Sequence, residues 1–318
     1  MTDFSNSPCN VPGQVVIKHI DQWLFKTAPS SRLATLRILC GLYATIFLVA
    51  RAESFWTTAD LPARQVEGVG VLWFLDSPLS ASIFHLAFLL TIVLGVAFTL
   101  GWRFRLVGPT FSLLFLFVAT YRLSFGHVIH TEHLIALHLL VLGFTQSGDA
   151  LSLGRRAQKN DAERQSAVYG WPIQIMILLT VITYVLAGIS KVQHGGWDWL
   201  TGDVLRNQVA YDNLRKELLG SPHSPFGGWL VRFGWLFPPA AIATSIVEIG
   251  AFVALANQQR LRWAFALSAW AFHVGVVLTM AISFPYPLSF VAYAPLFAVE
   301  QIWSTKLVTR LLRRKTYL

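Results

Sequence analysis

The stretch from Leu79 to Gly101 reads LSASIFHLAFLLTIVLGVAFTLG and contains no acidic residue, lysine or arginine. A helix of about 20 apolar residues is long enough to cross the hydrocarbon core of a bilayer. Similar apolar segments occupy residues 33–50, 106–123, 132–147, 168–192, 239–256, 264–283 and 286–303. The segments at 132–147 and 286–303 are the weakest, because the first contains histidines and the second prolines. The sequence predicts an all-α fold, a polytopic integral membrane helix bundle of about eight transmembrane helices.

The composition excludes a water-soluble enzyme and a disordered protein. Of the 318 residues, 54% are hydrophobic and 13% are charged, whereas soluble domains have about 25% charged residues. The mean hydropathy is +0.54. The only cysteines are Cys9 and Cys40, so a disulfide framework is not expected.

The basic residues indicate how the chain crosses the membrane. Lys and Arg together number 25 against 16 Asp and Glu, a net charge of +9. With the N-terminus inside, 16 of the basic residues are cytoplasmic and 7 lie on the opposite side, as the positive-inside rule requires. The expected organisation is a cytoplasmic segment at 1–30, a transmembrane domain at 31–303 and a basic cytoplasmic tail at 304–318. We expect a protein of a bacterial cytoplasmic membrane, with membrane lipids and no nucleic acid as partners.

The long segment 193–238 is rich in tryptophan and phenylalanine, which anchor at membrane interfaces. We expect short interfacial helices at 198–219 and 227–236. The sequence Ser221-Pro222-His223-Ser224-Pro225 predicts a break between them.

Ionisable residues within spans are candidate functional residues, because their burial in lipid is costly. Arg37 is close enough to a span end to extend its side chain to the surface. Glu248 lies near the middle of its span, where a structural hydrogen-bonding role and a catalytic role are both open. Lys191 ends its span just before Gly195 and Gly196. It could favourably occupy a helix C-terminus as a cation, or act as a base once desolvation leaves its amine neutral.

Histidines gather in His127-Val128-Ile129-His130-Thr131-Glu132-His133, with His138 following. A metal site and an ordinary helix start at the interface both fit this spacing. The sequence contains no adjacent histidines, which argues against the membrane desaturases and hydroxylases, and no metal is predicted. His85, His133 and Lys191 all fall in the outer half of the predicted bundle, and His273 lies near mid-span. Their convergence predicts a pocket.

The sequence Ala187-Gly188-Ile189-Ser190-Lys191, followed by Trp197 and Gly202, resembles a motif of the horizontally transferred transmembrane (HTTM) domain family. This family includes the membrane half of vitamin K-dependent gamma-carboxylase. Further similarity lies in Leu36–Gly41, in Glu132-His133 with the apolar run to Asp149, in Phe272-His273, and in Pro295–Phe297. The resemblance covers about residues 30–303.

The resemblance implies roles for individual residues. In the carboxylase, the lysine that matches Lys191 deprotonates reduced vitamin K, and the histidine that matches His133 lies near the reacting substrate. Lys191 and His133 are therefore the expected catalytic residues. The expected pocket members are His273, Glu248, His130, His85 and Trp197. The implied cofactor is a reduced, vitamin K-like quinone, and the implied chemistry is that of a gamma-carboxylase or quinol-epoxidase-like lyase or monooxygenase.

Two departures from the carboxylase weaken the case for carboxylation itself. The sequence has no counterpart of the large lumenal region, which a separate lumenal or periplasmic subunit could replace, and Ser190 stands where the animal enzymes have an additional lysine. We therefore expect an enzyme that acts on a quinol or another lipid-soluble substrate at the outer face. The alternatives are a non-catalytic membrane partner in the maturation, export or immunity of a small secreted peptide, and a histidine-bound metal enzyme.

Overall fold

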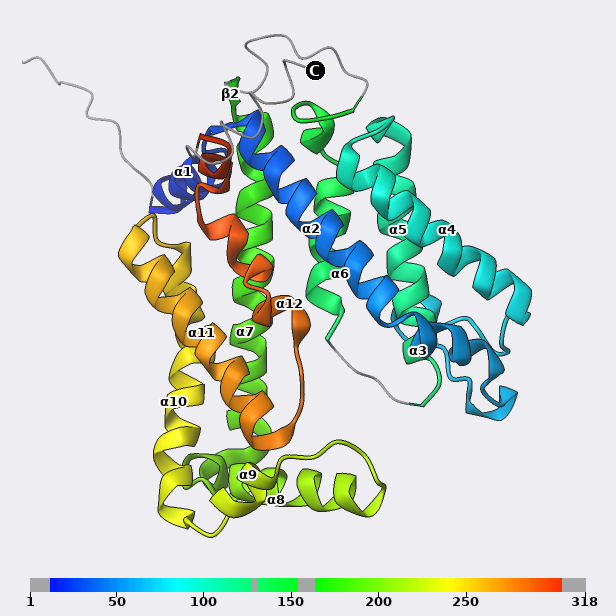
Figure 1. The fold of residues 1–318 in the computed structure, drawn as a ribbon. Coiled ribbons are helices and arrows are strands. Elements are labelled where there is room, and N and C mark those ends of the chain that lie inside the picture. The colour runs from blue at the N-terminus through cyan, green and yellow to red at the C-terminus, as the bar shows by residue number, and fades with distance from the viewer. Residues whose placement is uncertain (1–11, 127–130, 154–163, 305–318) are drawn as a thin grey trace, which may run out of the picture.

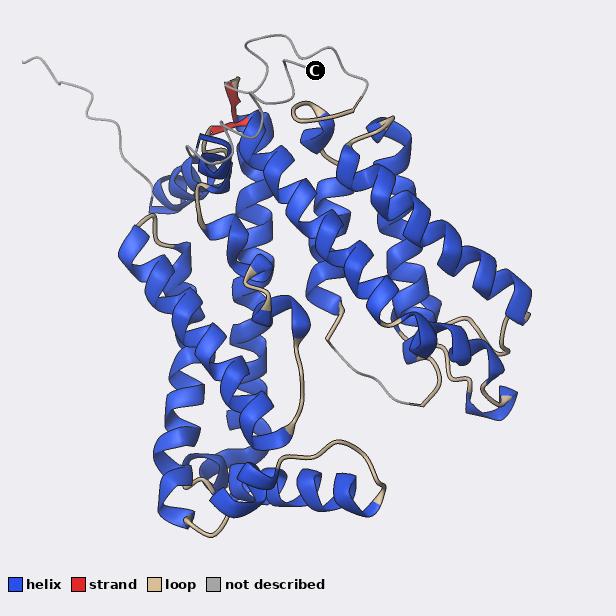
Figure 2. Ribbon diagram, viewed as in Figure 1, coloured by secondary structure: helices blue, strands red, loops and turns tan. Residues whose placement is uncertain are grey.

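The computed structural model describes residues 12–126, 131–153 and 164–304. These residues form an almost entirely helical bundle (Figures 1 and 2). The strands described are β1 (Ala28–Pro29) and β2 (Gln165–Ser166), which pair antiparallel with Ala28 opposite Ser166. The bundle confirms the predicted all-α fold.

Six helical stretches in the described chain are long and apolar enough to cross a membrane. They are α2 (Ser30–Ala50), α4 (Ala81–Leu100), α5 (Phe104–Leu123), α7 (Ala167–Leu200), Gly234–Leu255, and α11 (Gln259–Met280). Gly234–Leu255 joins η5 (Gly234–Leu236), α10 (Phe237–Ile249) and η6 (Gly250–Leu255). These six stretches confirm the prediction of an integral membrane protein.

The predicted count of eight spanning helices is not confirmed. The segment expected at 132–147 contains α6 (His133–Gly143), and its 11 residues extend only about 16 Å at 1.5 Å per residue. The segment expected at 286–303 divides into α12 (Pro285–Leu288), η7 (Val291–Leu296) and η8 (Val299–Ser304). Three prolines explain this division, because proline cannot donate the backbone hydrogen bond of a helix interior; they are Pro285, Pro287 and Pro295.

The remaining elements are short and connect or flank the long helices. They are α1 (Pro12–Leu24), α3 (Ala52–Trp56), η1 (Thr57–Asp60), η2 (Ala63–Gln65), η3 (Gly70–Leu72), η4 (Gln146–Gly148), α8 (Asp203–Leu218) and α9 (Pro225–Leu230). Helix α8 runs across the lower ends of α7, α10 and α11, far from α1 (Figure 1). The two short helices expected after α7 are therefore present, with a break at residues 219–224.

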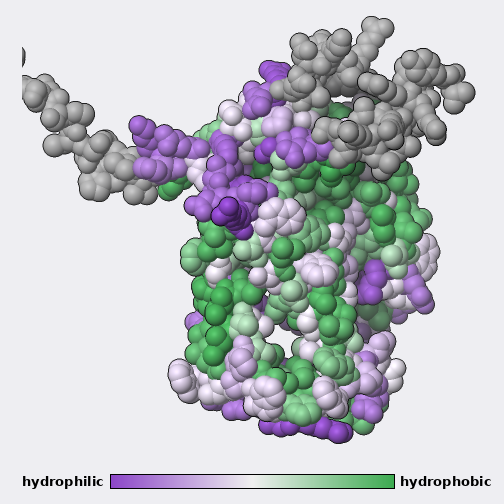
Figure 3. Space-filling view, turned by 60° about the vertical axis from the view of Figure 1, so that its left-hand side comes forward, coloured by the Kyte–Doolittle hydropathy of each residue, from purple (hydrophilic) through white to green (hydrophobic). Residues whose placement is uncertain are grey.

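The long helices form two groups (Figure 1). Helices α2, α4, α5 and α6 pack around buried phenylalanines, and α7 packs with α10, η6 and α11. The two groups meet where α7 contacts α2 and α6. On the face seen in Figure 3, hydrophobic residues cover the middle of the molecule and hydrophilic residues lie at both ends, and the surface is hollowed just above the lower end. Such a distribution suits a protein surrounded by lipid.

The expectation that the Arg37 side chain extends to the surface is wrong. The side chain is fully buried, and its guanidinium donates hydrogen bonds to the carbonyl oxygens of Ser147 (2.7 Å) and Leu151 (2.6 Å) and to Ser152 Oγ (2.8 Å). Arginine has five N–H donors in a fixed fork, so it can hold several carbonyls of one loop. Arg37 thus fixes the 146–152 loop against α2.

Candidate functional site

The site begins where α7 and α10 approach each other closely at Gly188. A Cβ atom placed on Gly188 would lie 2.8 Å from Ile249 Cγ1 and 2.9 Å from Glu248 Cβ. These distances are shorter than real side chains tolerate, so only glycine permits this approach. Lys191 follows on the next turn of α7, and its side chain therefore reaches Glu248.

Lys191 and Glu248 form an ion pair inside the bundle. Lys191 Nζ lies 2.5 Å from Glu248 Oε1, and the Glu248 side chain is only 4% exposed. The ammonium also lies 4.9 Å from the Phe272 ring centroid and 5.4 Å from that of Trp199. Aromatic faces stabilise a cation at these distances. Glu248 Oε2 is buried and accepts no hydrogen bond from any residue that the structure describes.

The chain turn after Lys191 places Trp199 beside this pair. Gly196 has φ 56° and ψ −139°, which breaks the helical path within α7, at the glycine pair where the sequence predicts the helix end. Beyond the break, Trp199 is buried and its indole N–H donates to Ser245 Oγ at 2.9 Å. The ring is thereby fixed between α7 and α10, over the lysine.

A cavity of about 480 Å³ opens next to the ion pair. It lies between α6, α7, α10 and α11, with α8 contributing on one side. Its lining mixes polar groups with apolar side chains: Thr131, His133, Leu134, Thr183, Tyr184, Ala187, Lys191, Trp199, Leu205, Gln208, Arg215, Thr244, Glu248, Phe272, His273, Val276, Met280, Ile282, Phe284 and Pro287. Volumes of about 300–1,000 Å³ are typical of small-molecule sites.

Two further groups of polar side chains face this cavity. His133 Nε2 lies 3.4 Å from Thr183 Oγ1. The Tyr184 hydroxyl lies 2.8 Å from His273 Nε2 and 2.7 Å from the Tyr293 hydroxyl. Because Tyr184 and His273 are both buried, this hydrogen-bonded cluster holds their rings in fixed positions on the cavity wall.

A model of the HTTM domain matches residues 25–303 of the chain. The chain belongs to the HTTM domain family. No curated protein and no solved structure matches it. The match includes Gly188, Lys191 and His133, so the residues that carried the resemblance lie within this HTTM domain.

The HTTM domain brings together four of the residues named from the sequence: Lys191, His133, Glu248 and His273 all line the cavity. His85 does not; its ring stacks on Trp56 with centroids 3.8 Å apart, and its Nε2 lies 3.0 Å from the Trp56 carbonyl oxygen. Trp197 is 76% exposed and also lies outside the cavity lining. His130 lies outside the described residues.

The structure also locates His138, the histidine that follows the sequence cluster. His138 is fully buried in the HTTM domain, with Nδ1 2.7 Å from the Tyr286 hydroxyl and Nε2 3.1 Å from the Met176 carbonyl oxygen. These contacts suit a packed core histidine. Within the described residues, no group of three or more His, Cys, Asp or Glu side chains is placed to hold a metal ion.

Several residues that line the cavity were not predicted from the sequence. Trp199, rather than Trp197, faces Lys191, because the break at Gly196 changes which side of the chain faces the cavity. Tyr184 had a usable signal, since it precedes Lys191 by seven residues and positions i and i+7 share one helical face. Arg215 comes from α8, and no sequence pattern predicts that this helix contacts the cavity.

Proposed function

We propose that this HTTM protein is a membrane enzyme whose Lys191–Glu248 pair removes a proton from a hydroxyl group of a lipid-soluble substrate. The observation that carries the proposal is the position of the pair: Lys191 Nζ and Glu248 Oε1 are 2.5 Å apart and both residues line the cavity. Ionisable side chains buried in a membrane domain generally mark functional sites.

The pair can exist in two forms that differ only in where one proton lies. In the first, an ammonium faces a carboxylate; in the second, a neutral amine faces a carboxylic acid. Burial penalises the charge of the Glu248 carboxylate, and transfer of one ammonium proton to that carboxylate gives the second form. The neutral amine then has a lone pair, so Lys191 Nζ can accept a proton from a substrate hydroxyl. Glu248 holds the amine in place throughout.

A reduced quinone fits the residues around this pair. Leu134, Phe272, Val276 and Pro287 provide apolar contacts for an aromatic ring, while Glu248 Oε2 is a buried acceptor without a described partner. His133 on α6 and Thr183 on α7 line the same cavity as Lys191 and could orient a second oxygen of the substrate. A bound quinol would supply an acidic hydroxyl and two electrons. The resemblance to the carboxylase supports a lyase or monooxygenase reaction as the overall chemistry.

A second candidate function is the non-catalytic binding of a secreted peptide. Its support is the surface of α8, where Tyr211, Leu214 and Leu218 are 69%, 56% and 78% exposed. Such side chains could contact an apolar peptide as well as a lipid surface. This function would need α8 and would not need the amine of Lys191.

The test is quinol oxidation by purified protein in lipid nanodiscs, followed as oxygen consumption with short-chain naphthoquinols and benzoquinols. We expect a Lys191→Gln variant to lose 10²- to 10⁴-fold in rate, the usual contribution of a general base. The lysine control is Lys26→Gln, which removes an exposed lysine bonded to Asn257 and should leave the rate unchanged. Equal rates in wild type and Lys191→Gln would refute the base. Loss of a peptide-dependent phenotype in Leu214→Ser and Leu218→Ser alone would favour the second function.

A further inference from the structure

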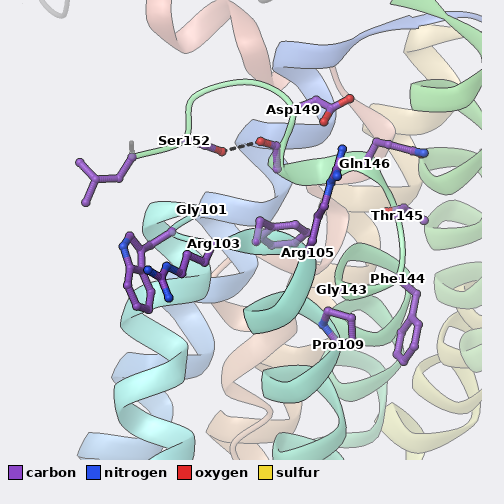
Figure 4. A pocket seen from close by; sticks show the side chains of 14 residues that line it. Gly101, Arg103, Arg105, Pro109, Gly143, Phe144, Thr145, Gln146, Asp149 and Ser152 are labelled. Carbon is purple, nitrogen blue, oxygen red and sulfur yellow. Dashed lines mark hydrogen bonds between the residues drawn. The ribbon is translucent and has the colours of Figure 1, made fainter. Parts of the chain in front are cut away.

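A second, larger cavity lies at the end of the molecule opposite α8. Its volume is about 900 Å³, and it is formed by the turn between α4 and α5 together with the chain that follows α6 (Figure 4). It shares no lining residue with the Lys191 cavity.

Two arginine side chains contribute positive charge to the lining of this cavity. Arg103 and Arg105 line it, and Arg105 extends from α5 toward the loop that carries Gln146 (Figure 4). Both arginines are exposed, and neither forms an ion pair with any residue in the described part of the chain. The N-terminus of the 20-residue helix α5 opens at the same place, and its dipole adds positive charge. Asp149 also lines the cavity, where its carboxylate accepts a hydrogen bond from the Tyr169 hydroxyl at 3.0 Å, so the lining contains two arginines against one carboxylate.

The backbone of the turn between α4 and α5 brings the two arginines close to the 146–152 loop. Gly101 and Arg103 both have positive φ values, 68° and 41°, and together they make the tight turn that joins two candidate membrane spans. A Cβ atom on Gly101 would lie 2.3 Å from Ser152 Oγ and 2.9 Å from Arg37 Cζ. The glycine thus lets the arginine-bearing turn approach the loop that Arg37 fixes.

Apolar side chains surround the cationic groups. Trp102, Phe144 and Leu153 line the cavity and are 44%, 60% and 60% exposed. The Arg103 guanidinium lies 5.1 Å from the Trp102 ring centroid, at the edge of the cavity. A soluble anion would gain nothing from these side chains. A phospholipid would, because its phosphate carries the charge and its acyl chains are apolar.

We propose that this cavity binds the headgroup of an anionic phospholipid, with the phosphate between Arg103 and Arg105. The acyl chains lie against Phe144 and Leu153, alongside the ends of α4 and α5. Basic pockets between transmembrane helices are known to take anionic headgroups, and arginine is suited to phosphate because its N–H groups can donate in pairs.

The test measures thermal stabilisation of the detergent-purified chain by short-chain phosphatidylglycerol, with phosphatidylcholine and inorganic phosphate as parallel ligands. We expect phosphatidylglycerol to bind the wild type most tightly. Arg103→Gln and Arg105→Gln should each weaken phosphatidylglycerol binding about fivefold, which is roughly the contribution of one basic residue near an anionic lipid surface. The double variant should weaken it about thirtyfold, because the two contributions add in free energy. Raising the salt concentration should reduce these differences. Arg260→Gln, an exposed cation outside the cavity, is the matched control and should bind as wild type.

Leu153→Ser provides a variant that leaves both arginines intact. It should weaken phosphatidylglycerol binding without changing the response to inorganic phosphate. Three results would overturn the proposal: equal binding of phosphatidylcholine, an effect of Arg260→Gln as large as that of the double variant, or full stabilisation by inorganic phosphate alone. Each variant is compared with its own melting temperature in the absence of lipid, so a loss of folding is visible separately.

Discussion

In the described part of the chain, two ion pairs contain a buried glutamate, Glu132 or Glu248, and they differ in whether both oxygens of that carboxylate have a partner. Lys191–Glu248 and Arg122–Glu132 have N–O distances of 2.5 Å, and both carboxylate side chains are 4% exposed. Each cation also lies near an aromatic ring, with Arg122 5.0 Å from the Phe55 centroid and Lys191 4.9 Å from that of Phe272. By charge and burial alone, the two would be assigned the same role.

Their surroundings separate them. Glu132 Oε2 accepts a hydrogen bond from Thr131 Oγ1 at 2.7 Å, so both oxygens of Glu132 have partners. Glu248 has one oxygen without a described partner, and the Lys191 side chain is 29% exposed where that of Arg122 is 11%. Arginine stays protonated under all ordinary conditions, whereas lysine can lose its proton. The Arg122 pair leaves only Arg122 Nε without a described partner, whereas the Lys191 pair leaves a carboxylate oxygen beside the cavity; we therefore expect a structural role for the first pair and ligand contact for the second.

The largest effect on stability is expected from Arg122→Met. It leaves the Glu132 carboxylate buried without its cation, and breaking a buried pair in this way costs about 3–5 kcal/mol. Chemical unfolding in detergent micelles measures the loss. The double variant Arg122→Met/Glu132→Leu should recover most of it, because no uncompensated charge remains. A double variant as unstable as the single one would show that the pair does not act as a unit.

A smaller effect is expected from Gly188→Ala. The added methyl group meets Glu248 Cβ and Ile249, and forcing extra volume into a packed contact costs about 1–3 kcal/mol. Because the contact sets the distance between α7 and α10, the variant should also lose quinol oxidation. Gly250→Ala is the control, since a Cβ atom there has no neighbour within 4 Å. Wild-type activity in Gly188→Ala would show that the close approach does not position the ion pair.

Tyr184→Phe should have a still smaller effect. It removes a hydroxyl that lies 2.8 Å from His273 Nε2 and 2.7 Å from the Tyr293 hydroxyl. The net contribution of such a bond is about 1 kcal/mol. Because Tyr184 lines the cavity, we expect the variant to raise KM for a quinol several-fold with little change in kcat. Tyr286→Phe loses a comparable bond to His138 in the core, and it should destabilise the chain without changing KM.

The sequence predicted the helical bundle and the cavity-lining lysine because both depend on local information. Runs of apolar residues define the spans, and charges within them are rare enough to stand out, as Lys191 and Glu248 do. The pairing of these two across 57 positions is a tertiary contact that no periodicity contains. Trp197 was expected from its place in the family motif, but it is 76% exposed, and Trp199, beyond the break at Gly196, lies beside Lys191 instead. For the segment 286–303, hydropathy predicted one continuous spanning helix, whereas the prolines divide it into three short helical elements.

The smallest effect on stability is expected from Lys191→Arg. This variant tests most directly whether the Lys191–Glu248 pair differs in kind from the Arg122–Glu132 pair. The substitution keeps the positive charge beside Glu248 and near Phe272, and makes this pair chemically the same as Arg122–Glu132. The Lys191 side chain is 29% exposed, which gives the longer side chain room, so we expect the free energy of unfolding to change by less than about 1 kcal/mol, in the range of partly exposed ion pairs.

Activity in the same variant should fall as far as in Lys191→Gln, because a guanidinium does not give up its proton and cannot act as a base. Quinone binding should persist within a few-fold, since the apolar lining is unchanged. Oxygen consumption and quinone binding, measured on one preparation, separate the two properties. If Lys191→Arg retained the wild-type rate, the amine would serve only as a fixed positive charge, and the two ion pairs would differ in exposure but not in kind. If it lost both folding and activity, the cavity would instead depend on the exact length of the lysine side chain, and Lys191 would belong with Arg122 as a structural residue.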